Sequence, residues 1–132
     1  MPHDEKRSGL PGDWLRRAMS NLVRAEQAKP EEVLWEDLCF DAQQAAEKAL
    51  KAMLSHLDVP FRFVHDIGEL LTAVDNSGKE IPPEVFEAAE LTGYAVEARY
   101  PGLYEPVTPI EHERAVKLAR LVVEWVKGEL DH

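Results

Sequence analysis

The sequence contains a single cysteine, Cys39, and no long apolar run. One cysteine cannot form an internal disulfide or build a cysteine-rich zinc module. The apolar runs are a few residues long, whereas a helix needs about 20 apolar residues to span a bilayer. Residues 1–12 are charged and lack the apolar core of a secretory signal. These absences predict a cytoplasmic protein with no membrane association.

Basic residues are in short supply. The chain has 15 Lys and Arg against 25 Asp and Glu, a formal net charge of -10. Because duplex DNA is bound by a basic face, this balance argues against a protein that coats DNA. It is compatible with a small nucleotide site, or with an acidic face that meets a basic protein partner.

Familiar catalytic and metal motifs are also missing. The sequence has no glycine-rich phosphate loop and no His-Glu-x-x-His. No two histidines have metal-ligand spacing on one helix; they are His3, His56, His65, His112 and His132. Cys39 lies between Leu38 and Phe40 and is interpreted as a packed thiol. We therefore predict neither a metal nor a cofactor.

The composition that is present is typical of one globular domain. Of the 132 residues, 45% are hydrophobic and 30% are charged, and this length accommodates one core. Residues 1–12 contain two prolines and two glycines and are predicted to be a flexible leader. Residues 13–132 are predicted to form a single helical domain.

Apolar residues recur at spacings of three and four along five segments, and no segment alternates as a strand would. The predicted helices cover about 14–28, 36–57, 66–74, 82–99 and 110–130. Asp13 and Asp66 are expected to cap the first and third helices. The fourth helix should turn Val85, Ala88, Ala89, Thr92, Ala95 and Val96 inward. The fold class is therefore all-α, an antiparallel up-down bundle of four long helices and one short helix.

The second predicted helix carries a polar row. Gln44, Lys48 and Lys51 occupy positions i, i+4 and i+7 and therefore share one face, apart from an alanine-rich stripe. One amide and two ammonium groups can hold a phosphate and hydrogen-bond a base or sugar. The alternative is a solvated face in which Glu47 and Lys51 form a helix pair.

Two further segments hold candidate site residues. His65 precedes the predicted cap Asp66 and can bind a ligand or transfer a proton; alternatively it is a surface histidine beside the cap. Arg99 continues an inward stripe and can meet a phosphate or a carboxylate; alternatively it neutralises the end of its helix. Tyr100 and Tyr104 can stack on a base or pack on the bundle end.

These segments together resemble one known family. The string Phe40-Asp41-Ala42-Gln43-Gln44-Ala45-Ala46-Glu47-Lys48-Ala49-Leu50-Lys51, then His65-Asp66-Ile67 and Arg99-Tyr100-Pro101, is similar to the HEPN domain (higher eukaryotes and prokaryotes nucleotide-binding). The resemblance implies a helical bundle, usually a homodimer, that associates with nucleotides or RNA. In prokaryotes it also implies pairing with a minimal nucleotidyltransferase, often as a toxin and antitoxin.

Family members that cleave RNA carry an arginine followed by four to six residues and a histidine. None of the arginines in this chain has a histidine at that distance. The Arg99-Tyr100-Pro101 motif is more similar to the branch that binds nucleotides without cleaving. With the family in view, we group Gln44, Lys48, Lys51, His65, Arg99 and Tyr100 as one candidate site.

Three functions compete. In the first, a dimeric module binds a nucleotide or RNA phosphate through Lys48, Lys51 and Arg99, with Gln44 and His65 orienting it and Tyr100 closing the site. In the second, a metal-independent ribonuclease toxin brings Arg99 together with His65 or His112. In the third, the bundle is a scaffold, and Gln44 and Arg99 are buried and bonded to each other.

Overall fold

The structure, a computed structural model, describes residues 9–61, 66–97 and 106–131. Within these ranges every regular element is a helix, so the prediction of an all-α chain is confirmed. The elements are α2 (Pro11–Glu26), α3 (Trp35–His56), α4 (Ile67–Asn76), the 3₁₀ helix η1 (Pro83–Thr92), α5 (Gly93–Glu97) and α6 (Pro109–Leu130).

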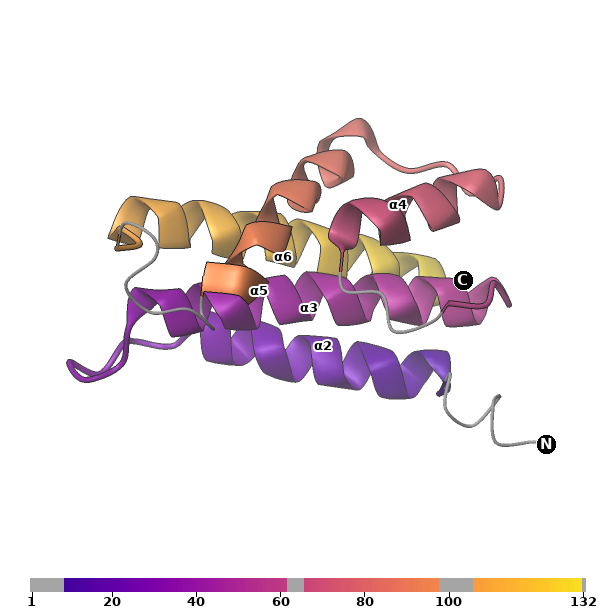
Figure 1. Cartoon of the computed structure of the whole chain (residues 1–132). Coiled ribbons are helices and arrows are strands. Elements are labelled where there is room, and N and C mark those ends of the chain that lie inside the picture. The colour runs from indigo at the N-terminus through magenta and orange to yellow at the C-terminus, as the bar shows by residue number, and fades with distance from the viewer. Residues whose placement is uncertain (1–8, 62–65, 98–105, 132) are drawn as a thin grey trace.

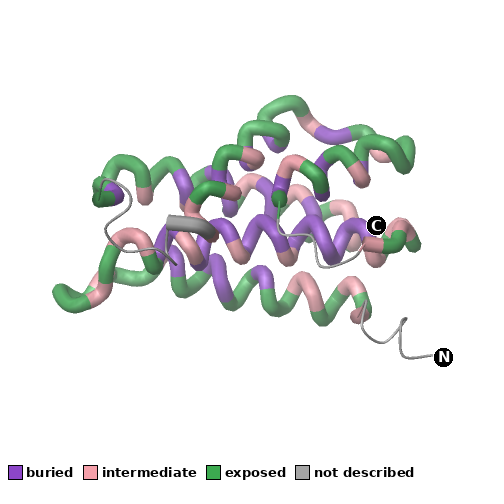
Figure 2. Tube along the Cα trace, viewed as in Figure 1, coloured by how far each residue is buried: buried purple, intermediate pink, exposed green. Residues whose placement is uncertain are grey.

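Helix α3 lies at the centre of the fold (Figure 1). It contacts α2 on one side, α6 on another, and α4, η1 and α5 on a third. Helix α2 runs opposite to α3, whereas α3 and α6 run in the same direction because η1 and α5 carry the chain back between them. Burial follows this arrangement, since α3 is buried along most of its length (Figure 2).

The contact between α2 and α3 depends on small side chains. Ala18 and Ala25 of α2 are fully buried, and so are Ala42, Ala45 and Ala49 of α3. Alanine has the highest helix propensity and lets two helix backbones approach closely. The larger side chains Leu50, Met53 and Leu54, also fully buried, fill the space toward the other elements. This close seam brings the polar residues of α2 and α3 together.

Polar side chains cap the first turns of α4 and α6. Asp66 caps α4 as predicted, because its Oδ1 accepts a hydrogen bond from the backbone N–H of Glu69 at 3.2 Å. The prediction that Asp13 caps the first helix is wrong. Helix α2 begins three residues before the predicted start at Trp14, at Pro11, whose fixed φ suits a first helical position. Asp13 instead lies in the first turn, where its carboxylate complements the helix dipole.

The predicted helix over 82–99 is instead the 3₁₀ helix η1 followed by the short α5. A 3₁₀ helix has three residues per turn, so side chains three apart stand in one row. Val85, Ala88 and Leu91 form the fully buried row of η1. Ala89 and Thr92, predicted inward, are only half-buried because they belong to another row. Ala95 in α5 is also half-buried.

Candidate functional site

Two chains of polar side chains follow the seam between α2 and α3. The outer chain joins Arg24, Asp41, Asn21 and Lys48 across the two helices. The inner chain joins Gln44, Gln43, Glu47 and Lys51 along α3 alone. Both chains lie beside the buried alanines, and each contains an amide, a carboxylate and a lysine.

In the outer chain a neutral amide, Asn21, separates the Arg24–Asp41 ion pair from Lys48. Arg24 Nε lies 3.4 Å from Asp41 Oδ2. Asn21 donates from Nδ2 to Asp41 Oδ1 at 3.2 Å and accepts at Oδ1 from Lys48 Nζ at 2.8 Å. Asp41 and Asn21 are 5% and 8% exposed. The buried carboxylate is therefore paired to an exposed guanidinium, and the lysine is bonded to a neutral oxygen.

The surroundings of Lys48 leave its charge only partly compensated. Burial lowers the pKa of Lys48, and the nearby Arg17 and Lys51 lower it further, whereas Glu47 and Asp41 raise it. Lys48 forms no ion pair with any described residue. An anion placed beside this ammonium group would stabilise its charged form.

The inner chain links four side chains of α3 around the Glu47 carboxylate. Lys51 Nζ donates to Glu47 Oε2 at 3.0 Å, and Gln43 Nε2 donates to Glu47 Oε1 at the same distance. Gln44 then donates to Gln43 Oε1 at 2.7 Å. Glu47 and Lys51 are 3% and 6% exposed. The lysine charge is thus neutralised inside the protein, as a buried ammonium group requires.

Two aromatic rings flank the buried lysine. Lys51 Nζ lies 5.4 Å from the ring centroid of Trp14 and 6.0 Å from that of Phe61. The two rings meet edge to face, with centroids 5.9 Å apart. These contacts add cation–π stabilisation to the Glu47 pair and fix the ammonium group in place.

The predicted site residues therefore divide into three groups. Gln44 and Lys48 are half-buried at the seam, and Lys51 is buried in the inner chain. The alternative pairing of Glu47 with Lys51 is confirmed, but a solvated face is wrong for this pair because both side chains are buried. His65, Arg99 and Tyr100, together with Tyr104, lie outside the described residues.

Sequence reasoning missed Asn21 and Asp41. Asn21 stands one turn from Ala18 within the apolar stripe of α2, and Asp41 stands next to the buried Ala42 of α3. A polar residue inside the stripe of each of two neighbouring helices is a signal for a polar contact across the seam, because such groups are buried in pairs. That signal was present in the sequence.

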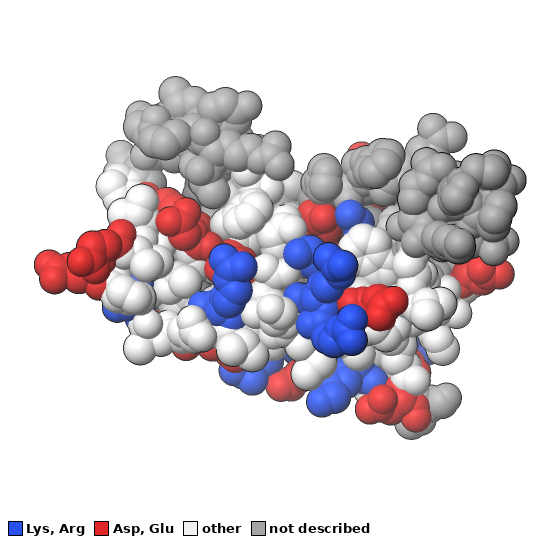
Figure 3. Space-filling model, turned by 90° about the horizontal axis from the view of Figure 1, so that it is seen from below, with Lys and Arg blue, Asp and Glu red and all other residues white. Residues whose placement is uncertain are grey.

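Basic side chains gather where the outer chain reaches the surface. Arg17 and Arg24 are exposed on α2 at i and i+7, and Lys48 faces them from α3. Figure 3 shows Lys and Arg concentrated in the middle of the face over α2. We call Arg17, Arg24 and Lys48 the basic strip. It forms on a chain whose formal net charge is -10.

A cavity of about 400 Å³ opens beside the basic strip, at the end of α2 and the start of α3. Arg24 and Asp41 of the outer chain form part of its wall. The other lining residues are Gln27, Ala28, Pro30, Val33, Asp37, Leu38 and Phe40. The cavity therefore combines an apolar lining with three charged groups.

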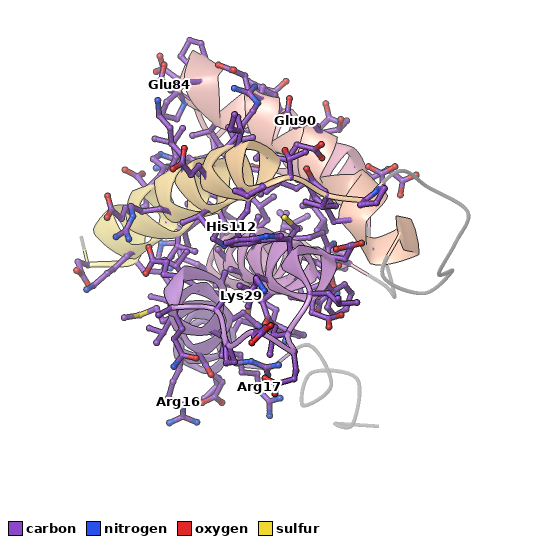
Figure 4. All side chains as sticks on the ribbon, turned by 90° about the vertical axis from the view of Figure 1, so that its left-hand side faces the viewer. Arg16, Arg17, Lys29, Glu84, Glu90 and His112 are labelled. Atoms are coloured by element: carbon purple, nitrogen blue, oxygen red, sulfur yellow. The ribbon has the colours of Figure 1, made fainter. Side chains whose placement is uncertain are left out.

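His112 lies at the same end of the molecule but serves another contact (Figure 4). Its Nε2 is 2.7 Å from the backbone oxygen of Ala25, near the end of α2. Its ring packs against Trp35 with the centroids 4.8 Å apart and the planes tilted by 45°, and Lys29 Nζ lies 5.2 Å from the Trp35 ring centroid. This cluster ties α6 to the end of α2.

The described residues contain no group of three or more His, Cys, Asp or Glu side chains that could hold a metal ion. Cys39 is buried, as expected of a packed thiol. Over the same part of the chain, no helix has both the length and the apolar composition needed to cross a membrane.

Comparison with known proteins identifies the family. A sequence model of the HEPN domain matches residues 12–129, and the chain therefore belongs to the HEPN domain family. No protein of curated function matches the sequence.

Three solved structures are similar to this chain. TT1696 from Thermus thermophilus is 29% identical, with a TM-score of 0.74 over 89% of this chain and 96% of its own. ST0689, an archaeal HEPN homologue, is 28% identical, with a TM-score of 0.70 over 91% and 97%. A HEPN domain protein from Thermotoga maritima is 25% identical, with a TM-score of 0.57 over 98% of both chains.

Proposed function

We propose that this HEPN domain protein binds the phosphate of a nucleotide or of RNA on the basic strip. The observation that carries the proposal is the state of Lys48. Its half-buried ammonium group is bonded to the neutral Asn21 oxygen, with Arg17 nearby and no carboxylate paired to it among the described residues. A local surplus of positive charge on an acidic protein suits a small anionic ligand.

The residues of the strip would divide the contacts. Lys48 supplies a point charge, and the exposed Arg17 guanidinium can bind a phosphate through two parallel hydrogen bonds. Gln44 keeps its Oε1 available to accept from a sugar hydroxyl or a base, because its Nε2 is used by Gln43. Lys51 acts as a positioning residue. It holds Glu47, which in turn holds Gln43, the residue to which Gln44 is bonded.

The remaining predicted residues would complete the same site. Arg99 is expected to add a second phosphate contact, His65 to orient the ligand, and Tyr100 to stack on it or close it. Their substitution is an independent test: Arg99→Ala should weaken binding as Lys48→Met does, while leaving the fold intact.

We further propose the assembly that the family resemblance implies, a homodimer that pairs with a minimal nucleotidyltransferase in a toxin–antitoxin system. An apolar row on α2 supports the homodimer. Leu15 is half-buried, and Met19 and Val23 are 38% and 57% exposed, at successive spacings of four. Such a row is a suitable contact for a second copy. Sedimentation of wild type and a Val23→Glu variant tests it; an unchanged mass would contradict it.

The binding proposal is tested by calorimetric titration of the full chain with ATP and with a short single-stranded RNA. Lys48→Met should weaken binding at least tenfold and reduce its dependence on salt, because one charged phosphate contact is lost. Lys117→Met, an exposed lysine of α6, is the matched control and should bind as wild type does. Equal affinity for Lys48→Met and wild type would overturn the proposal.

A second candidate, a purely structural module, is favoured by the buried Glu47–Lys51 pair of the inner chain. In that case the same titrations detect no nucleotide or RNA binding, and the polar residues of the seam matter only for stability. The two functions are therefore separated by one experiment.

A further inference from the structure

The cavity beside the basic strip has the size and lining of a site for a single planar ring. Its volume of about 400 Å³ lies at the lower end of the range for small-molecule sites. Val33, Leu38 and Phe40 supply apolar wall, and Phe40 is half-buried with part of its surface open to the cavity. An aromatic face of this kind stacks on a nucleobase regardless of its identity.

The cavity adjoins the basic strip, because Arg24 belongs to both. Arg24 and Asp41 belong both to its wall and to the outer chain. One asparagine side chain, Asn21, separates the Asp41 carboxylate from the Lys48 ammonium group. A mononucleotide can therefore place its phosphate at Lys48 and its base in the cavity, because only the Asn21 side chain lies between the two.

The two carboxylates that line the cavity, Asp37 and Asp41, differ in whether their oxygens already have bonding partners. Both oxygens of Asp41 are in use, Oδ1 by Asn21 and Oδ2 by Arg24. Asp37 stands one turn earlier on the same face of α3, is exposed, and forms no ion pair with a described residue. Asp37, Phe40 and Asp41 thus line the cavity from neighbouring positions of α3, within one turn of each other.

An available carboxylate selects among the bases by its chemistry. It has only acceptors and binds two parallel N–H donors. Guanine presents such a pair, its N1–H and its exocyclic amino group, on its Watson–Crick edge. Adenine presents an acceptor beside its amino group, so one oxygen of the carboxylate would face a lone pair. A site built for a hydrogen bond rejects a ligand that cannot make it.

We infer that this cavity binds a guanine base, with Asp37 accepting from its N1–H and amino group and Phe40 stacking on its ring. The inference rests on the proposed phosphate binding for its full ligand, a guanine nucleotide or a guanine residue of RNA. The base contact itself is independent of Lys48 and is tested with a ligand that has no phosphate.

The first experiment titrates the full chain with guanosine and adenosine. Guanosine should bind at least tenfold more tightly than adenosine, and Asp37→Asn should remove that preference, because the amide NH2 would face one of the two N–H donors of guanine. Asp75→Asn, an exposed aspartate of α4, is the matched control and should keep it. Equal binding of the two nucleosides, or a preference that survives Asp37→Asn, would overturn the inference.

The second experiment separates the base from the phosphate. With GMP and AMP, Lys48→Met should weaken both ligands by the same factor and leave their ratio unchanged. If guanosine binds through Asp37 but GMP binding ignores Lys48, the guanine site stands and the phosphate proposal fails. If Lys48 matters but GMP and AMP bind equally, the phosphate proposal stands and the guanine site fails. Spermidine binding that needs Asp37, without guanosine binding, assigns the cavity to a cation and overturns the inference.

Discussion

The outer and inner chains run side by side along α3 and are built from the same kinds of side chain, yet they end differently. In the inner chain the Lys51 ammonium group meets the Glu47 carboxylate at 3.0 Å, and both are buried. In the outer chain the carboxylate of Asp41 is paired to the exposed Arg24, and Lys48 bonds to a neutral amide.

The difference shows that residue type alone does not assign a role to a charged side chain. Lys48 and Lys51 are three positions apart on one helix and would have the same propensities in isolation. What separates them is which partner the fold places within reach. The Lys51 charge is neutralised by a buried carboxylate, whereas the Lys48 ammonium group is bonded to a neutral amide oxygen.

The largest loss of stability is expected from a substitution that breaks the inner chain. Glu47→Ala leaves the buried Lys51 ammonium group without its carboxylate and should lower the free energy of unfolding by about 3–5 kcal/mol. Urea denaturation measures it. The double variant Glu47→Leu, Lys51→Met should recover most of that loss, because a buried ion pair can be replaced by apolar side chains. A loss below about 1 kcal/mol for Glu47→Ala would contradict a structural role for the buried Glu47–Lys51 pair.

A smaller effect should follow from interrupting the outer chain at its centre. Asn21→Ala removes the hydrogen-bond donor to the buried Asp41 carboxylate and should cost about 1–3 kcal/mol in unfolding free energy. Asn76→Ala, at the exposed end of α4, is the comparison and should change stability by no more than about 0.5 kcal/mol. If the two alanine variants unfold alike, Asn21 does not support Asp41.

Of the substitutions in the two chains, Lys48→Met should change stability least. Lys48→Met should change the unfolding free energy by less than about 1 kcal/mol, because the loss of one hydrogen bond is offset by the removal of a half-buried charge. Thermal unfolding, compared with Lys51→Met, measures the contrast directly. A loss for Lys48→Met as large as that for Lys51→Met would mean that both lysines are structural.

The smallest expected effect is the contribution of Asp41 to the pH dependence of stability. Burial raises the pKa of Asp41, although Arg24 and the Asn21 hydrogen bond oppose that shift. Between the unfolded pKa, about 3.9, and the raised folded value, the native state binds more protons than the unfolded state. Wild type should therefore lose stability relative to Asp41→Asn as the pH rises through this window. Urea denaturation of both proteins between about pH 4 and pH 7 checks the sign, and the opposite trend would contradict it.

Much of the helical framework was predictable because its signals are local. The alanine-rich stripe placed α3 to within a residue of its observed bounds, and Asp66 marked the start of α4. The start of α2 was misplaced because Asp13 and Pro11 are both good first-turn residues, and the proline takes the earlier position.

The error in η1 had a readable cause. Residues 84–92 form three triplets, each with glutamate first and Val85, Ala88 or Leu91 second. A repeat of three suits a 3₁₀ helix, and reading it with a period of 3.6 assigned Ala89 and Thr92 to the buried row. The candidate site was predicted less well, because partners such as Asn21 for Lys48 lie on a different helix and no spacing within α3 reveals them.

The 3₁₀ character of η1 also determines how far the chain travels. Ten residues span about 20 Å at the 3₁₀ rise, against about 15 Å as an α-helix. Glu87 and Glu90 stand one 3₁₀ turn apart in η1, and Arg114 of α6 binds both of them, with 3.3 Å between its guanidinium and Glu87. This contact holds η1 at the 3₁₀ pitch. The length of η1 thus decides which turn of α3 is reached by α5. Rewinding η1 as an α-helix would draw α5 back by about 5 Å, close to one helical turn.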